Sequence, residues 1–198
     1  ERTINLNGFS KNFAMTGWRM GFIVAPEWVI EVFGKFAINK YTCVSKFNQI
    51  VAGAIFGDVE LDGHKYEYVG DKIKDTLKAD FAEYEKKGKF VEECLRLLAP
   101  YVVPNKAEGA FYLFPNFERV LNLSYVKNDL GLDGDRDFVY WLLEERGIAN
   151  LAGRDFGDGG KGYVRFSYAE DREKHIIPGM KHVLKVVIEL IEKSGEVP

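Results

Sequence analysis

Several features that define particular protein classes are scarce in this chain of 198 residues. It holds two cysteines, Cys43 and Cys94, which are too few and too far apart for a disulfide framework or a cysteine metal site. Both lie in apolar, helix-like contexts, so we expect them in a protein core and in a reducing compartment, the cytoplasm. The longest uncharged run, Phe47–Gly57, is about half as long as a membrane span requires, so we expect no membrane partner.

An excess of positive charge is also absent. The chain has 27 basic and 30 acidic side chains and no long cluster of lysine and arginine, which argues against nucleic acid as a partner. The three histidines have no cysteine, histidine or aspartate at ligand spacing, so we expect no metal site. Hydrophobic residues make up 46% of the chain, the balance of a globular protein.

Residues 1–57 predict part of an α/β layer. Thr3–Leu6 alternates like a strand, and Met20–Ala25 is a continuous apolar run typical of a strand covered on both faces. A helix is expected after Pro26 and a second one from Lys46 to Phe56. The chain opens with Glu and with a strand-like stretch, so we expect either a processed N-terminus or a piece of something longer.

Residues 58–198 predict an α+β domain, a small sheet with helices packed on it. A long apolar pattern runs from Tyr68 to Leu98 and indicates a helix that Gly88 allows to bend. The later elements, in order, are a strand at Ala110–Phe114, a helix at Asp137–Arg146, a strand at Tyr163–Tyr168 and a helix at Gly179–Lys193.

The segment from Gly8 to Gly21 carries the most chemistry. It places Lys11 in a loop after a strand and Arg19 just before a buried strand. Packing among Phe9, Phe13 and Trp18 would desolvate the lysine and favour a nucleophilic amine, and the arginine offers a forked donor for a phosphate. Taken alone, the same residues also suit an ordinary surface lysine and arginine.

This segment resembles the lysine signature of the class I/II, fold-type I pyridoxal-phosphate aminotransferases, and its Ala14–Arg19 core resembles the prokaryotic aspartate aminotransferase branch. The resemblance implies that Lys11 forms a Schiff base with pyridoxal 5'-phosphate and that Arg19 holds the cofactor phosphate. Some relatives have a serine three residues before the lysine. Here that position is Gly8, so the corresponding phosphate contact is either missing or made by Ser10 or a backbone N–H.

Two later segments resemble the same family. Glu108–Pro115 is similar to its Gly-Ala-Phe-Tyr strand, and Gly162–Ala169 to its C-terminal Val-Arg-apolar-Ser strand. In the second strand the alternation puts Arg165 on the face opposite Val164 and Phe166. The resemblance implies that Arg165 binds the substrate α-carboxylate.

The resemblance implies the C-terminal part of the aminotransferase fold: residues 1–57 would end the large α/β cofactor domain, and residues 58–198 would form the interdomain helix and the α+β small domain. It implies a homodimer acting on an amino acid, aspartate by resemblance, with 2-oxoglutarate, and a chain that is inactive alone. Two alternatives stay open: a carbon–sulfur lyase or eliminase on the same scaffold, and a non-catalytic effector-binding domain of a regulator.

Two other sets of residues have ordinary structural interpretations. Gly157, Gly159 and Gly162 match a dinucleotide-binding pattern, but a strand follows them where that motif needs a helix, so we expect a loop or turn. Thr42, Ser45 and Asn48 lie where family members contact the phosphate or the neighbouring subunit, and helix capping explains them equally well.

Overall fold

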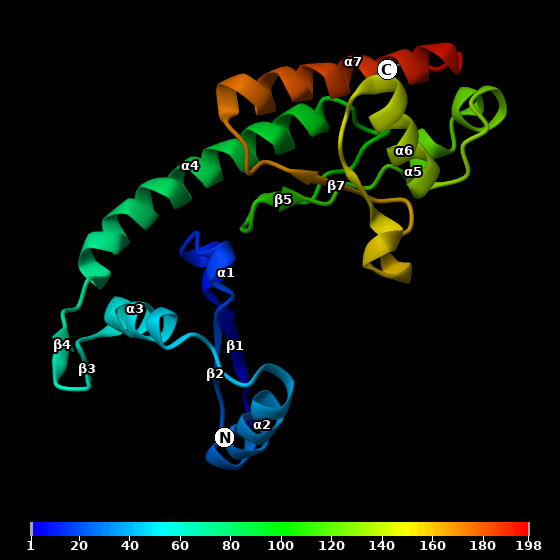
Figure 1. The fold of residues 1–198 in the computed structure, drawn as a ribbon. Helices are drawn as coiled ribbons and strands as arrows, with labels where there is room; N and C mark the ends of the chain where they lie inside the picture. Colours follow the sequence, from blue (N-terminus) through cyan, green and yellow to red (C-terminus); the bar gives the residue numbers. More distant parts are fainter. Residues whose placement is uncertain (1, 198) are drawn as a thin grey trace. The chain divides into compact units, whose positions relative to one another are not determined.

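The computed structural model of the chain describes residues 2–197, which form two compact units (Figure 1). The division falls between Asp80 and Phe81, inside the long helix α4 (Gly70–Arg96). Among the described residues the first unit has two two-stranded sheets and the second has one three-stranded sheet, and each unit has its own cluster of buried apolar side chains. Among residues 2–197, no helix combines the length and the apolar character that crossing a membrane would need.

A pair of antiparallel strands organises the first unit. β1 (Asn5–Gly8) pairs with β2 (Gly21–Val24). The connection between them contains the short helix α1 (Phe9–Asn12) and the 3₁₀ turn η1 (Thr16–Trp18). Both predicted strands are therefore present, the first of them starting two residues later than expected. Because the two strands pair with each other, the segment between them, which carries Lys11 and Arg19, is closed at its base. We call this segment the β1–β2 connection.

The burial of these strands differs from the prediction. The apolar run in β2 predicted a strand covered on both faces, yet Phe22 and Val24 are 37% and 58% exposed, and Leu6 in β1 is 75% exposed. The prediction of a buried strand is therefore wrong for this chain. A continuous apolar run indicates burial in a larger sheet with layers on both sides, and the sheet that β2 forms with β1 has only these two strands among residues 2–80.

Two helices and a hairpin complete the first unit. α2 (Glu27–Tyr41) starts directly after Pro26, and α3 (Lys46–Phe56) has the predicted bounds. The hairpin of β3 (Val59–Leu61) and β4 (His64–Tyr66) was not predicted. Cys43, expected in the core, is exposed in the link between α2 and α3, because its apolar neighbours in sequence do not pack over it.

A small apolar cluster fixes the site segment to α3. Phe9, Met15 and Met20 come from the β1–β2 connection and its end, and they are buried together with Ala52 and Ile55 of α3. This packing joins residues distant in sequence and determines how the connection is held. It is the only buried cluster that the described part of this unit contains.

The second unit contains a three-stranded antiparallel sheet in the order β5 (Tyr112–Leu113), β7 (Val164–Ser167) and β6 (Leu151–Ala152). The predicted strand at 110–114 is shorter than expected, since Ala110 takes a positive φ of 61° and leaves the extended conformation. The remaining elements are α5 (Glu118–Leu121), η2 (Tyr125–Asp129), α6 (Asp135–Arg146), η3 (Gly153–Phe156), η4 (Asp158–Gly160), η5 (Arg172–Ile176) and α7 (Ile177–Lys193).

Helices α4 and α7 supply much of the core of this unit. α7 covers the helix predicted at Gly179–Lys193, and its Met180, Val183 and Val187 side chains are buried. α4 continues through Gly88, where an added Cβ would lie 3.1 Å from Tyr168. Gly88 therefore lets the buried Tyr168 approach the helix closely.

The compact units do not divide where the predicted domains do. The predicted boundary lies between residues 57 and 58, but residues 58–80 pack with the first unit. The Val69 N–H donates to the Ala54 carbonyl at 2.8 Å, and Val69 and Ile73 pack against the buried cluster of that unit. The assignment of residues 1–57 and 58–198 to two domains of a whole enzyme stays a prediction.

Candidate functional site

The β1–β2 connection carries four of the predicted site residues, Gly8, Ser10, Lys11 and Arg19. β1 ends at Gly8, and α1 then places Lys11 in its last turn. The Phe9 N–H donates to the Met20 carbonyl at 3.2 Å, which closes the connection at the point where the strands meet. The fifth predicted residue, Arg165, belongs to the second unit.

The surroundings of Lys11 differ from the expectation. Its side chain is exposed, whereas Phe9 is buried, and the rings of Phe9 and Phe13 lie 5.3 Å apart in contact with Phe56. The third predicted neighbour, Trp18, stacks on Phe47. The expectation that these rings desolvate the lysine is therefore wrong for this chain, since they pack toward α3 instead.

Arg19 stands in an unusual backbone conformation. Its φ and ψ are 53° and 47°, in the left-handed region, and Ala14 also has a positive φ of 53°. Non-glycine residues in that region cost energy and often mark functional loops. The Arg19 Nη1 donates to the Thr16 carbonyl at 3.3 Å, and the rest of the side chain is exposed. The guanidinium is thus tethered to its own turn and open to an anion.

A hollow of about 400 Å³ adjoins this turn, lined by Ala14, Thr16, Gly17, Trp18, Phe47 and Asn48. The Asn48 Nδ2 donates to the Trp18 carbonyl at 3.0 Å, so α3 holds the turn before Arg19. Ser45 precedes α3 without a side-chain capping bond, and Thr42 follows α2. The Ser45 side chain therefore does not cap α3. The Asn48 side chain instead fixes the backbone at Trp18, next to Arg19.

Asn7 and Gly21 also shape the connection, although the sequence did not single them out. The Asn7 Oδ1 accepts the Gly8 N–H at 2.8 Å and the Asn12 Nδ2 at 2.9 Å. A Cβ at Gly21 would lie 2.9 Å from the Asn7 carbonyl oxygen, so the strands approach too closely there for a side chain. The signal for Asn7 was its place directly before the motif.

In the second unit, Arg165 lies on the central strand β7. Val164, Phe166 and Tyr168 are buried, while Arg165 is half-buried and Ser167 exposed, so the predicted alternation is confirmed. The Arg165 Cζ lies 4.6 Å from the ring centre of Tyr112 and 4.9 Å from that of Phe156. The two rings hold the guanidinium by cation–π contact, and its edge can still take a carboxylate.

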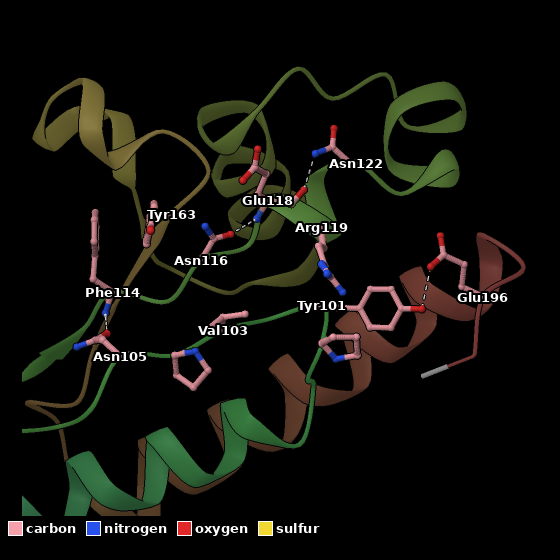
Figure 2. A pocket seen from close by; sticks show the side chains of 12 residues that line it. Tyr101, Val103, Asn105, Phe114, Asn116, Glu118, Arg119, Asn122, Tyr163 and Glu196 are labelled. Atoms are coloured by element: carbon pink, nitrogen blue, oxygen red, sulfur yellow. Dashed lines mark hydrogen bonds between the residues drawn. The ribbon is translucent and has the colours of Figure 1, made fainter.

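A larger hollow of the second unit, about 840 Å³, contains none of the predicted site residues (Figure 2). Its lining residues come from the segments 100–105 and 114–122, together with Tyr163 and Glu196. Its amide side chains are used locally: the Asn105 Oδ1 accepts the Phe114 N–H, and the Asn116 Oδ1 accepts the Glu118 N–H. The candidate residues are Lys11 and Arg19 in the first unit and Arg165 in the second, which their chemistry distinguishes, and the size of this hollow does not add to them.

Metal chemistry finds no support among residues 2–197, where no three histidine, cysteine or acidic side chains gather closely enough to hold an ion. The absence of a metal stays a prediction. The glycines at 157, 159 and 162 lie in turns around η4 and are followed by β7, which agrees with the loop predicted for them.

Comparison with known proteins decides the family. The model of the family "Aminotransferase class I and II" matches residues 1–177. The chain belongs to the class I and II aminotransferase family. The match covers both units and includes the segments around Lys11 and Arg165, so the predicted resemblance is confirmed.

Individual aminotransferases agree with this assignment. The chain is 35% identical over 187 residues to "Aromatic-amino-acid aminotransferase 2" of Thermococcus litoralis, covering 93% of this chain and 42% of that protein. It is 38% identical over 174 residues to "Aspartate aminotransferase" of Pyrococcus abyssi, covering 88% and 38%. The solved structure of the aromatic aminotransferase from Pyrococcus horikoshii OT3 matches with a TM-score of 0.77 and 34% identity over 98% of this chain and 44% of that one.

The chain thus has part of the aminotransferase fold, as predicted, with mixed α and β elements. It spans about two fifths of the length of the relatives that it matches.

Proposed function

We propose that the protein to which this chain belongs is a pyridoxal-phosphate-dependent aminotransferase. The observation that carries the proposal is the family membership together with Lys11 and Arg19 in one closed connection. An amine and an exposed guanidinium in one short segment are the groups that an aldehyde bearing a phosphate requires.

The residues of the connection fit that cofactor. Between residues 2 and 26 the chain has three basic side chains, Arg2, Lys11 and Arg19, and no aspartate or glutamate. A phosphate therefore meets no like charge from this segment, and the Ser10 hydroxyl adds a neutral donor. The Gly8 N–H already donates to the Asn7 Oδ1, so we assign the contact of the missing serine to the Ser10 hydroxyl.

Each residue has a distinct part in the proposed reaction. Arg19 would hold the phosphate through its forked donors, with the Ser10 hydroxyl as an additional donor. Lys11 would hold the cofactor at its aldehyde group, and the amine of Lys11 would act as general base and acid for the proton at the substrate Cα. When bound, pyridoxal phosphate supplies the electron sink for the negative charge that develops at this carbon.

Arg165 would bind the α-carboxylate of the amino acid. Its guanidinium can form two parallel hydrogen bonds to a carboxylate, and the rings of Tyr112 and Phe156 limit the directions it can take. Orientation of the substrate matters because proton removal requires the Cα–H bond to stand in one direction.

We further propose an amino acid and a 2-oxo acid as substrates, with aspartate and 2-oxoglutarate first, a homodimeric assembly and a cytoplasmic location. Relatives named for aspartate and for aromatic amino acids support this substrate class. The exposed apolar side chains of β1, β2 and α2 suit a chain that is covered by further protein surface, and we expect residues 1–198 alone to be inactive.

Borohydride reduction of the intact protein tests the proposal. Reduction fixes the cofactor on its lysine, and digestion followed by mass spectrometry locates the label. We expect the pyridoxyl group on Lys11 and its loss in Lys11→Ala. A label on another lysine would overturn the assignment.

Steady-state assays separate the alternatives. Turnover that needs both an amino donor and 2-oxoglutarate supports an aminotransferase. Pyruvate and ammonia formed without an oxo acid would indicate the lyase, and ligand binding without any turnover would indicate an effector-binding domain.

A further inference from the structure

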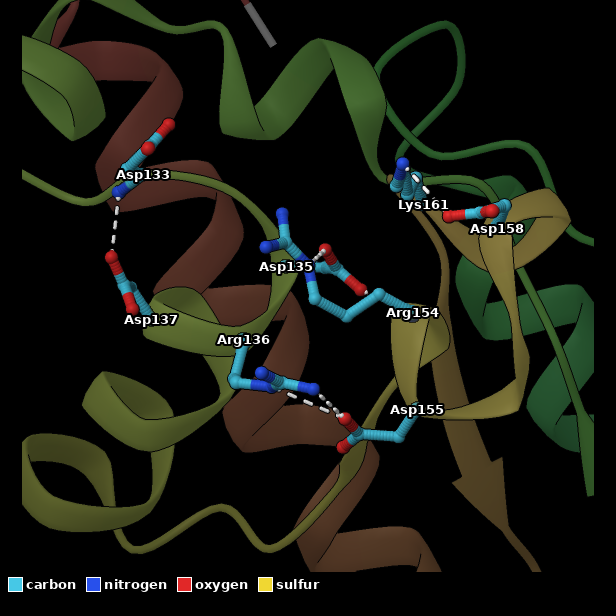
Figure 3. A network of polar contacts seen from close by, with 8 residues as sticks. All are labelled: Asp133, Asp135, Arg136, Asp137, Arg154, Asp155, Asp158 and Lys161. Carbon is cyan, nitrogen blue, oxygen red and sulfur yellow. Dashed lines mark hydrogen bonds and ion pairs between the residues drawn. The ribbon is translucent and has the colours of Figure 1, made fainter.

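One charged side chain of the second unit is completely buried. Asp135, at the start of α6, is 0% exposed and is the one charged residue that residues 2–197 bury in this way. Its Oδ2 accepts the Arg154 backbone N–H at 2.6 Å, and its Oδ1 accepts the Arg154 Nε at 2.7 Å (Figure 3). Burial raises the pKa of Asp135, but these two hydrogen bonds outweigh it and hold the pKa below its ordinary value. The carboxylate is therefore charged and fully engaged with a single residue.

Arg154 belongs to the turn η3, in which Gly153, Arg154 and Asp155 are each held by a hydrogen bond. The Gly153 N–H donates to the Tyr163 carbonyl at 2.8 Å, and a Cβ at Gly153 would overlap the Gly160 carbonyl oxygen. Arg154 is bound by Asp135, and Asp155 accepts from the Arg136 Nε at 3.1 Å. The turn is thus fixed to the start of α6 by an ion pair whose carboxylate is buried and by an exposed pair next to it (Figure 3).

The next residue in the turn touches the candidate substrate arginine. Phe156 follows Asp155 directly, and its ring centre lies 4.9 Å from the Arg165 Cζ. Phe156 is 52% exposed and its ring also meets the Phe114 ring edge-on at 5.7 Å, so its position depends on the backbone of η3 together with this contact and not on the buried core. Any movement of that backbone therefore reaches the guanidinium.

We infer that Asp135 is a positioning residue for substrate binding: through Arg154 it fixes η3, and η3 keeps the Phe156 ring against the Arg165 guanidinium. The inference rests on the proposed function for its consequence, the affinity for a substrate carboxylate. Asp135 takes no part in the chemical step, because it is buried and contacts no exposed group of the site.

Asp135→Asn in the intact protein tests the inference, with two readouts that need no catalysis. Loss of the charge breaks the double contact to Arg154, so amide hydrogen exchange in residues 153–157 should rise about tenfold while that of α7 stays unchanged. Phenylglyoxal, which modifies accessible arginines, should label Arg165 several times faster, as read by peptide mass. In the active enzyme the KM for the amino acid and for the oxo acid should rise about tenfold, with kcat nearly unchanged.

Asp158→Asn is the matched control. Asp158 lies in the same loop and pairs with Lys161 at 2.9 Å, but its side chain is 95% exposed, so the same substitution should change none of these readouts. If Asp135→Asn unfolds the protein, Phe156→Leu tests the same path from the exposed end and should raise KM and the labelling rate of Arg165.

The results separate this inference from the proposed function. A parent protein without aminotransferase activity would remove the proposed function, while exchange and labelling would still report on Asp135. Unchanged exchange and labelling in a folded Asp135→Asn protein would overturn the inference, as would equal loss of kcat at unchanged KM.

Discussion

The substitution Arg165→Lys tests the proposed carboxylate site most directly. A lysine keeps the positive charge but can form only one of the two parallel hydrogen bonds that a guanidinium offers a carboxylate. It also loses the planar contact with the rings of Tyr112 and Phe156, which lie 4.6 and 4.9 Å from the Arg165 Cζ.

The size of the effect follows from these contacts. One charge-assisted hydrogen bond is worth about 1.5–3 kcal/mol, and a weakened ring contact at a partly exposed site about 0.5 kcal/mol. A loss of about 2–3.5 kcal/mol in transition-state binding corresponds to a fall in kcat/KM of about 30- to 370-fold.

The assay is steady-state transamination by the intact protein with an amino donor and 2-oxoglutarate. Arg172→Lys is the control, since Arg172 also lies over a ring, that of Phe90 at 5.5 Å, but outside the candidate site. We expect its kcat/KM to equal that of the parent. A folded Arg165→Lys protein with a kcat/KM within a few-fold of the parent would refute the assignment of Arg165 to the carboxylate.

The remaining predictions concern stability and can be measured by denaturant unfolding and circular dichroism. Asp135→Asn should cost about 1.5–3 kcal/mol at neutral pH, because it removes one of the charge-assisted hydrogen bonds that the buried carboxylate accepts from the partly exposed Arg154. Since the folded-state pKa of Asp135 is depressed, its contribution is complete above the unfolded pKa of about 3.9 and is lost as the pH falls through the folded value, so the parent should lose more stability in acid than the variant. Leu190→Ala, which opens a cavity at a fully buried position, should cost about 2–5 kcal/mol, and full stability there would contradict the described core. Gly153→Ala should destabilise η3 strongly and Gly159→Ala hardly at all, because only the first would place a Cβ against a backbone oxygen.

The helices could be predicted from the sequence because their signals are local. The bounds of α3 and most of α6 and α7 follow from apolar spacing and from flanking Pro and Gly residues. The alternation along β7 was also sufficient to put Arg165 on the face opposite the core. Periodicity records which face of an element is apolar, and in the second unit that face has a large core to pack on.

The failures share a different cause. β2 is apolar throughout and Cys43 has apolar neighbours, so both were expected inside, yet both are exposed. A sequence pattern indicates that a segment is suited to burial but does not say which other segment covers it. Residues 2–80 bury only a small cluster, and the rings expected around Lys11 belong to it.

The same limit applies to the candidate residues of the two units in opposite ways. Arg165 has contacts within residues 81–197: two rings contact it, and an ion pair with the buried Asp135 carboxylate fixes the turn that carries one of them. No periodic pattern could predict Asp135, because its partner Arg154 is brought to it only by the packing of η3 on α6. Lys11, in contrast, is exposed, and a lysine nucleophile gains reactivity when water is removed from it. The proposed reaction therefore requires that Lys11 be covered by surface from outside residues 2–80, whereas the orientation of Arg165 is already determined by its own unit.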